Sequence, residues 1–179
     1  MDDKGLGGTQ KVFCKRSLTG IIILLIIILL FILSAFTVYK GMGLTLCVVS
    51  GNSMSPTIED EAILLLNPKK ELERFDILVF EEDDKYMLKR LIGLPGDTVT
   101  VMDGHLFVNG DLYHEPYLDE DYCKNFKEQD FKITVPDRQY FLLGDNRDGS
   151  FDSRQIGMID KDQIVGTGIF VFGDNHNVR

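Results

Sequence analysis

Residues 86–110 read YMLKRLIGLPGDTVTVMDGHLFVNG, three short runs separated by two turn signals. The first run stops at Pro95-Gly96, where proline presets φ and glycine supplies the positive φ of a type II turn. Beyond this turn, apolar and polar residues alternate around Asp103-Gly104, a pair typical of a tight β-hairpin. The segment therefore predicts consecutive antiparallel strands.

Similar short runs flank this segment on both sides. They are LTLCVV (44–49), AILLL (62–66), DILVF (76–80), YFLLGD (140–145) and QIVGTGIFVFG (163–173). This part of the chain lacks strong helical periodicity, so we expect a mainly β domain built from antiparallel strands. Residues 112–132 are polar and acidic and fit no clear strand, and we interpret them as an insertion between strands.

Residues 20–39, GIIILLIIILLFILSAFTVY, contain no charge. As a helix they would be about 30 Å long, which matches the hydrocarbon thickness of a bilayer. Three basic residues lie between positions 11 and 16, whereas only Lys40 follows closely. The positive-inside rule then places residues 1–19 in the cytoplasm and a catalytic or binding domain, residues 40–179, outside the cell membrane.

Two alternatives to a membrane anchor use the same apolar segment. A cleavable secretory signal has the same order of charges, but its apolar region usually spans about 7–15 residues and ends at a small-x-small site. Here the run is longer, and Leu33–Ala35 (LSA) has leucine where a small residue should stand. A buried core helix would rarely be so uniformly aliphatic. We therefore expect one N-terminal transmembrane helix.

The charge and the metal-ligating residues limit the possible partners. A net charge of −9 argues against nucleic acid and against broad docking on anionic lipid. The cysteines and histidines are scattered, without the spacing of a metal site or disulfide framework, and we expect isolated thiols, no metal and no cofactor. These residues are Cys14, Cys47, Cys123, His105, His114 and His176.

The stretch 50–58, SGNSMSPTI, places serines in a turn-like segment after an apolar run. A serine hydroxyl is a weak nucleophile until a base removes its proton. The G-x-S-x-G motif fails because Ser55 occupies the final glycine position, and no S-x-x-K occurs in the chain. No histidine stands in a recognisable arrangement with these serines, which leaves a lysine from elsewhere in the chain as the candidate base.

The strand expected at 86–94 carries two adjacent cations. Alternation places Lys89 on the same face as Met87 and Leu91, and Arg90 on the other face. A buried lysine loses its proton more easily and can act as a general base, whereas arginine stays protonated. If either residue is the base, it is Lys89. Alternation alone favours a surface edge strand with both cations in solvent, so this alternative stays open.

Three segments resemble the signature boxes of bacterial type I signal peptidases, a serine/lysine peptidase family. They are SGNSMSPTI (50–58), KRLIGLPGD (89–97) and GDNRDGSFDSR (144–154). Their order and spacing match the family, as does the single apolar segment before the first box. The short chain with one anchor is similar to the Gram-positive-type members. The resemblance implies antiparallel sheets or a partly open barrel of the signal peptidase type.

The resemblance also implies roles for individual residues. Ser53 corresponds to the nucleophile that forms an acyl-enzyme, and Lys89 to the general base. Ser150 matches the hydroxyl that orients the lysine amine. The charged residues of the last box also match the family, and they are Asp145, Arg147, Asp152 and Arg154.

The last box holds several opposite charges, which indicates a framework of ion pairs. We expect Asp145 to pair with Arg90, and Asp152 to pair with Arg154. One position departs from some relatives, which have a second oxyanion-hole hydroxyl two residues before the nucleophile, where this chain has Gly51. The second donor is therefore unassigned.

The expected function is that of a membrane-anchored serine endopeptidase. By resemblance, its substrates are exported preproteins, from which it removes signal peptides at the outer face of the cytoplasmic membrane, with membrane lipid around its anchor. Two alternatives stay open, a dedicated processing peptidase for one or a few secreted proteins and a non-catalytic anchored β-domain that binds secreted chains. Met54, Pro56 and Ile58 could pack in the core or enter the membrane interface.

Overall fold

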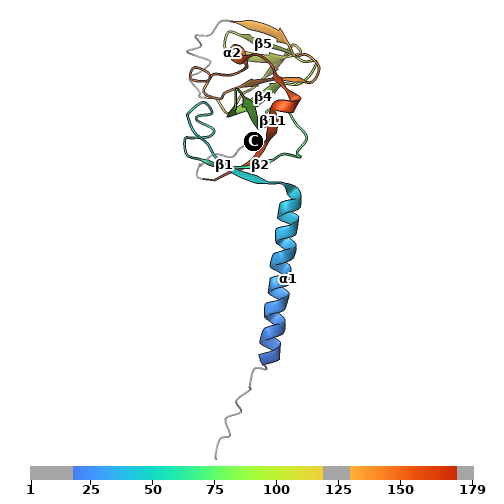
Figure 1. The fold of residues 1–179 in the computed structure, drawn as a ribbon. Helices are drawn as coiled ribbons and strands as arrows, with labels where there is room; N and C mark the ends of the chain where they lie inside the picture. Colours follow the sequence, from blue (N-terminus) through green and yellow to red (C-terminus); the bar gives the residue numbers. More distant parts are fainter. Residues whose placement is uncertain (1–17, 119–129, 173–179) are drawn as a thin grey trace, which may run out of the picture. The chain divides into compact units, whose positions relative to one another are not determined.

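The computed structural model describes residues 18–118 and 130–172 (Figure 1). Most of the expected cytoplasmic segment and the centre of the expected insertion lie outside these residues, as do Cys14, Cys123 and His176. The chain divides into two compact units, Met1–Gly41 and Met42–Arg179.

The described residues of the first unit form one long helix, α1 (Leu18–Met42). Its central part, Thr19–Val38, has a mean hydropathy of 3.4, and none of it is buried inside the protein. The large aliphatic side chains along this part are exposed. The length and composition of this helix suit a membrane span.

The second unit is built from antiparallel strands and two short helices. In chain order these elements are β1 (Thr45–Val48), β2 (Ile63–Asn67), β3 (Ile77–Glu82), β4 (Lys85–Gly93), β5 (Thr98–Met102), β6 (His105–Val108), β7 (Asp111–Tyr113), β8 (Phe131–Thr134), β9 (Gln139–Leu143), α2 (Ser153–Ile156), β10 (Ile159–Asp160), the 3₁₀ helix η1 (Lys161–Gln163) and β11 (Ile164–Phe172). All the strand pairs of the described residues are antiparallel, which confirms the fold class expected from the sequence.

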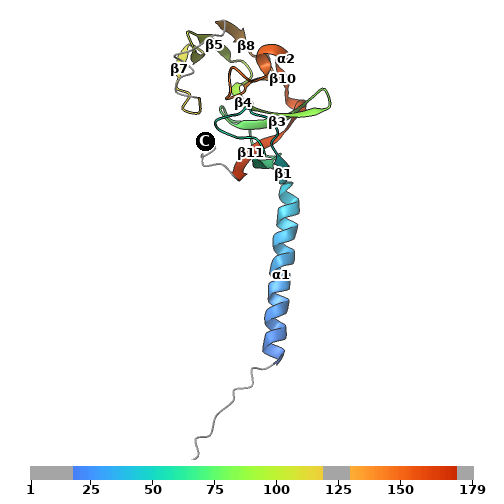
Figure 2. The same ribbon diagram turned by 90° about the vertical axis from the view of Figure 1, so that its left-hand side faces the viewer.

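The strands form two sheets. The larger has the order β1-β2-β11-β3-β4-β9-β10 and the smaller has the order β7-β6-β5-β8. Figures 1 and 2 show the smaller sheet at the end of the domain opposite β1 and β2. The last strand, β11, lies between β2 and β3, so strands from the beginning and the end of the domain pair side by side in the larger sheet.

Both turns expected in residues 86–110 are present. A turn at Pro95-Gly96 separates β4 from β5, and Gly96 has a φ of 86°. Asp103 and Gly104 join β5 to β6 with φ values of 49° and 76°. Two consecutive positive φ values are those of the type I′ hairpin turn, which follows the natural twist of the strands. The local turn chemistry therefore predicts this hairpin correctly.

The interpretation of residues 112–132 as strand-free is wrong at both ends. Residues 112 and 113 belong to β7, and residues 131 and 132 belong to β8. In β8, Phe131 and Ile133 are half-buried while the residues that follow each of them are exposed, so the strand does alternate. Both apolar side chains pack on the core of the smaller sheet. The alternation is hard to detect because the strand has only four residues.

The edge-strand alternative for residues 86–94 is also wrong. Strand β4 lies inside the larger sheet, between β3 and β9, and both faces are covered from Lys89 onward. Lys89 is 3% exposed and Arg90 is 1% exposed. The two cations therefore point to opposite faces of a buried strand, and each requires polar partners inside the protein.

A hydrophobic cluster fixes the loop between β1 and β2. Met54 and Ile58 are 1% and 0% exposed and pack with Leu64 and Ile77. The amide of Ile58 donates a hydrogen bond to the carbonyl oxygen of Met54 at 2.9 Å. The core alternative for these two residues is therefore correct, whereas Pro56 is exposed.

Candidate active site

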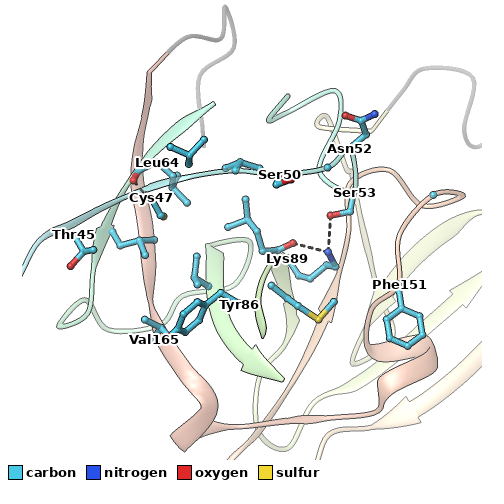
Figure 3. Close-up of a pocket in the computed structure, with 18 residues that line it drawn as sticks. Thr45, Cys47, Ser50, Asn52, Ser53, Leu64, Tyr86, Lys89, Phe151 and Val165 are labelled. Atoms are coloured by element: carbon cyan, nitrogen blue, oxygen red, sulfur yellow. Dashed lines mark hydrogen bonds between the residues drawn. The ribbon is translucent and has the colours of Figure 1, made fainter. Parts of the chain in front are cut away.

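Ser53 lies in the loop that follows β1. Its neighbour Met54 is buried in the core, which anchors the loop and leaves the half-buried Ser53 side chain facing a cavity (Figure 3). The carbonyl oxygen of Ser53 accepts a hydrogen bond from the amide of Asn146 at 3.1 Å. The first and last boxes of the sequence therefore contact each other at the serine.

Lys89 reaches this serine from β4. Its Nζ donates hydrogen bonds to Ser53 Oγ at 2.7 Å and to the Leu88 carbonyl oxygen at 2.8 Å (Figure 3). A distance of 2.7 Å allows direct proton transfer between hydroxyl and amine. The structure thus brings together Ser53 and Lys89, which lie 36 residues apart in the chain.

Burial of the amine lowers the pKa of Lys89 from 10.5 to about 8. Desolvation is the largest cause, because it disfavours the charged form. The carboxylates of Asp152 and Asp145 act in the opposite direction, and the guanidinium of Arg154 lowers the pKa further. Near neutral pH a useful fraction of Lys89 is therefore the neutral amine, which can accept the proton of Ser53.

The second buried cation of β4, Arg90, pairs with Asp145 as the sequence predicted. Nε donates to Oδ1 at 2.8 Å and Nη2 donates to Oδ2 at 2.6 Å, with both side chains no more than 1% exposed. Arg90 Nη1 also donates to the Phe75 carbonyl oxygen, and its guanidinium lies 3.9 Å from the centre of the Tyr117 ring. This two-point pair holds β4 against the last box.

Asp152 and Arg154 also pair as expected. Arg154 Nε donates to Asp152 Oδ1 at 2.8 Å, and the amide of Gly144 donates to Asp152 Oδ2 at 2.9 Å. Asp152 also caps the N-terminus of α2, where its side chain accepts the amide of Arg154. Burial raises the pKa of the Asp152 carboxyl, and its hydrogen bonds oppose that rise. The pair therefore fixes the turn that carries Ser150.

Arg147 has a partner that the sequence did not reveal, the buried carboxylate of Glu115. The two side chains form an ion pair with 2% and 6% exposure. Burial raises the pKa of Tyr117, so its hydroxyl stays protonated and donates to Glu115 Oε1 at 2.7 Å. The available signal was that Arg147 had no assigned carboxylate after Arg90 and Arg154 were paired. Glu115 was hidden within the acidic run.

Ser150 is buried close to the site, but its contact with Lys89 differs from the expectation. Within the described ranges 18–118 and 130–172, Ser150 Oγ has no hydrogen-bond partner by distance and angle, and Lys89 donates to other groups. The hydroxyl still lies near enough to Asp152 to lower the pKa of that carboxyl. A Cβ at Gly144 would approach Ser150 Oγ to 2.1 Å, so only glycine permits this packing.

Gly51 adopts a φ of 99°, a conformation that favours glycine over serine. Its amide donates to Asp60 Oδ1 at 2.8 Å. The backbone conformation thus accounts for the absence of a hydroxyl two residues before Ser53. By contrast, the amide of Ser53 makes no hydrogen bond to any described residue, so it can donate to a bound carbonyl oxygen.

A cavity of about 620 Å³ adjoins the two residues. Figure 3 shows Thr45, Cys47 and Leu64 on one side of the Ser53–Lys89 contact and Phe151 on the other. Its lining is mostly apolar, and comprises Thr45, Cys47–Ser53, Leu64, Leu66, Val79, Tyr86–Lys89, Gly149, Phe151 and Val165. An extended peptide with small apolar side chains fits such a cavity.

Cys47 is a free thiol on the cavity wall, and burial raises its pKa, which disfavours the reactive thiolate. Across residues 18–118 and 130–172, no three histidine, cysteine, aspartate or glutamate side chains are grouped to hold a metal ion. Of the polar side chains that line the cavity, the Ser53 hydroxyl and the Lys89 amine form a hydrogen-bonded pair.

Comparison with known proteins identifies the family. The profile of the family described as "Signal peptidase, peptidase S26" matches residues 17–173. Signal peptidase I S of Bacillus subtilis strain 168 is 40% identical over 145 residues, covering 74% of this chain and 78% of that protein. Signal peptidase I P of Bacillus subtilis subsp. natto is 38% identical over 189 residues, and this match covers 95% of this chain and 97% of that protein.

A solved structure supports the same relationship. The crystal structure of a signal peptidase I from Enterococcus faecalis is 38% identical in sequence, with a TM-score of 0.50, and covers 55% of this chain and 97% of that chain. The family profile spans most of the chain, including all three boxes and the Ser53–Lys89 contact. The chain therefore belongs to the signal peptidase family, peptidase S26.

Proposed function

We propose that this protein is a membrane-anchored serine endopeptidase that removes signal peptides from preproteins, with Ser53 as nucleophile and Lys89 as general base. Membership of the signal peptidase family supports the activity. The observation that carries the residue assignment is the 2.7 Å contact between Lys89 Nζ and Ser53 Oγ, made by a lysine that is 3% exposed. A serine and a desolvated lysine in such contact suit acyl transfer.

In the proposed mechanism, Ser53 Oγ attacks the scissile carbonyl carbon while its proton moves to the neutral Lys89 amine. The amide of Ser53 donates a hydrogen bond to the oxygen that gains negative charge. When the tetrahedral intermediate collapses, the carbon–nitrogen bond breaks and protonated Lys89 gives its proton to the leaving amine. Lys89 is then neutral again and removes a proton from the water that attacks the acyl-enzyme. When the ester carbon–oxygen bond breaks, Lys89 returns this proton to Ser53 Oγ.

Three buried ion pairs support this geometry without taking part in the chemistry. The Arg90–Asp145 pair fixes β4, and the Asp152–Arg154 pair fixes the turn before α2. The Arg147–Glu115 pair links the last box to the segment that follows β7. Ser150 is proposed to orient the Lys89 amine when substrate is bound and the amine has lost its proton. Its buried hydroxyl has no hydrogen-bond partner among residues 18–118 and 130–172, and it is available for that hydrogen bond.

We further propose that residues 1–19 lie in the cytoplasm and that the β domain lies outside, because the basic residues precede the apolar segment. The apolar part of a signal peptide is itself held in the bilayer, so its cleavage site leaves the membrane near an anchored enzyme. Anchoring both partners in one membrane raises their effective concentration. Membrane lipid would then contact α1 along the exposed aliphatic side chains.

The test is cleavage of a panel of unrelated preproteins by the purified full-length protein in detergent, with cleavage sites mapped by mass spectrometry. We expect cleavage after small-x-small sequences in most of the panel. Activity should rise with pH around an apparent pKa of about 8, because only the neutral Lys89 amine is a base. Cleavage of a single preprotein would favour a dedicated processing peptidase. Binding without cleavage would favour a non-catalytic domain and contradict the proposal.

A further inference from the structure

Asn146 connects the last box to the loop that carries the proposed nucleophile. Its Nδ2 donates to the Asn52 carbonyl oxygen at 3.0 Å, and its backbone amide donates to the Ser53 carbonyl oxygen at 3.1 Å. Its Oδ1 accepts the amide of Gly149, also at 3.1 Å. One residue thus contacts two consecutive carbonyl groups of the nucleophile loop, from 94 positions further along the chain.

These two carbonyl groups define the backbone on both sides of Ser53. A peptide unit is planar and trans, so its carbonyl oxygen and its amide hydrogen point in opposite directions. The Asn52 carbonyl oxygen belongs to the same peptide unit as the amide of Ser53. Asn146 Nδ2 therefore fixes the direction in which the Ser53 amide points. The Asn146 amide holds the next peptide unit in the same way.

The direction of the Ser53 amide matters because it is the donor for the developing oxyanion. This amide has no partner within the part of the chain that the structure describes, and Gly51 supplies no hydroxyl as a second donor. A hydrogen bond to the Asn52 carbonyl also polarises the shared peptide unit and strengthens its amide as a donor. Both effects favour the transition state over the bound substrate.

We propose that Asn146 is a positioning residue that sets the oxyanion-binding amide of Ser53, an inference that rests on the proposed peptidase function. The amide of Ser55 also donates to the Asn52 carbonyl oxygen, at 3.2 Å, so this peptide unit keeps one restraint when Asn146 is altered. We therefore expect a change at Asn146 to lower kcat only partly, by less than the roughly 100- to 1000-fold loss of kcat that follows deletion of an oxyanion donor.

Asn146→Asp is the most specific variant for the test. It replaces the donating Nδ2 by an oxygen that repels the Asn52 carbonyl, while Oδ1 can still accept the Gly149 amide. The backbone bond to Ser53 is retained. Asn146→Ala removes the donor without adding a charge and is measured beside Asn146→Asp. If Asn146→Asp does not fold, Asn146→Ala takes its place in the test. Ser55→Ala is the matched control, because it removes a side-chain bond to Glu59 from the same loop.

Two inhibitors separate transition-state stabilisation from general support of the cavity. Ser53 Oγ adds to the carbonyl carbon of a substrate-like peptide aldehyde. The aldehyde oxygen then becomes an oxyanion that faces the Ser53 amide. The same peptide with a reduced scissile bond has no carbonyl oxygen at that position. We expect Asn146→Asp to lower kcat/KM and aldehyde affinity together by roughly 10- to 100-fold, mostly through kcat. Affinity for the reduced peptide and the activity of Ser55→Ala should stay near the wild-type values.

An Asn146→Asp enzyme with wild-type kcat/KM would overturn the inference and leave the proposed function intact. An equal loss of affinity for both inhibitors would also overturn it, because Asn146 would then support the cavity as a whole. Wild-type protein that neither cleaves preprotein nor binds the aldehyde would refute the proposed function itself, and the inference with it.

Discussion

Ser53→Ala and Lys89→Met should each lower kcat/KM for a preprotein by roughly 10⁴- to 10⁶-fold, the range found when members of a nucleophile–base unit are removed. Without Ser53 no acyl-enzyme can form. Without Lys89 the hydroxyl keeps its proton, since within the described residues the proposed base is the only group bonded to Ser53 Oγ. Because the two residues act as one unit, the double variant should lose little more than either single variant. The measurement is steady-state cleavage by each purified protein.

Folding controls make this result specific. Lys85→Met alters an exposed lysine at the start of the same strand, and we expect it to keep wild-type activity. Lys89→Met should be more stable than wild type at pH 7, because a protonated amine is then no longer buried. Because folding lowers the pKa of Lys89 from 10.5 to about 8, this residue reduces the free energy of unfolding of the wild type by up to about 3 kcal/mol below pH 8. Measurable turnover by Lys89→Met beyond that of Ser53→Ala would contradict the assignment.

Asp145→Asn should lower the free energy of unfolding by about 3–5 kcal/mol, the usual cost of leaving one charge of a buried pair without its partner. Arg90 is 1% exposed and cannot reach solvent when the carboxylate is removed. The matched control is Asp162→Asn, which breaks the exposed pair with Arg138. Exposed pairs contribute little, so this variant should lose less than about 1 kcal/mol. Denaturant unfolding of both variants measures the difference.

The same variant also tests the electrostatic link to Lys89. The carboxylate of Asp145 raises the pKa of the lysine, so its removal should lower that pKa and move the rise in activity to lower pH. Asp145→Asn with unchanged unfolding free energy would refute a stabilising role of the pair. An unchanged pH midpoint would show that Asp145 does not act on the lysine.

Local chemistry explains why part of the fold could be predicted from the sequence. The hairpin around Asp103-Gly104 and the turn at Pro95-Gly96 depend on the φ preferences of the residues in the turns. The pairs of Arg90 with Asp145 and Arg154 with Asp152 could be expected because each cation has few acidic partners in the boxes. The turn residues are adjacent in the chain and Arg154 shares a box with Asp152, whereas the Arg90–Asp145 pair joins two boxes across 55 positions.

Other features depend on contacts between distant parts of the chain. The burial of Lys89 follows from the position of β4 between β3 and β9, which alternation within one strand cannot reveal. Glu115 reaches Arg147 across 32 positions, and Asn146 reaches Asn52 across 94. Strand β8 was missed because it is short and pairs with β5, not with β7. Tertiary structure alone brings these groups together.

The central claim is that burial next to Ser53 lowers the pKa of the Lys89 amine to about 8, so that a useful fraction of it is uncharged near physiological pH. It is tested most directly by NMR titration of the Lys89 Nζ signal in ¹⁵N-lysine-labelled full-length protein in detergent micelles, assigned by its absence in Lys89→Met. We expect this signal to titrate with a pKa of about 8, well below the ordinary lysine value of 10.5. A Lys89 pKa at the ordinary lysine value of 10.5 would contradict the account, because the amine would then be protonated and unable to act as a base.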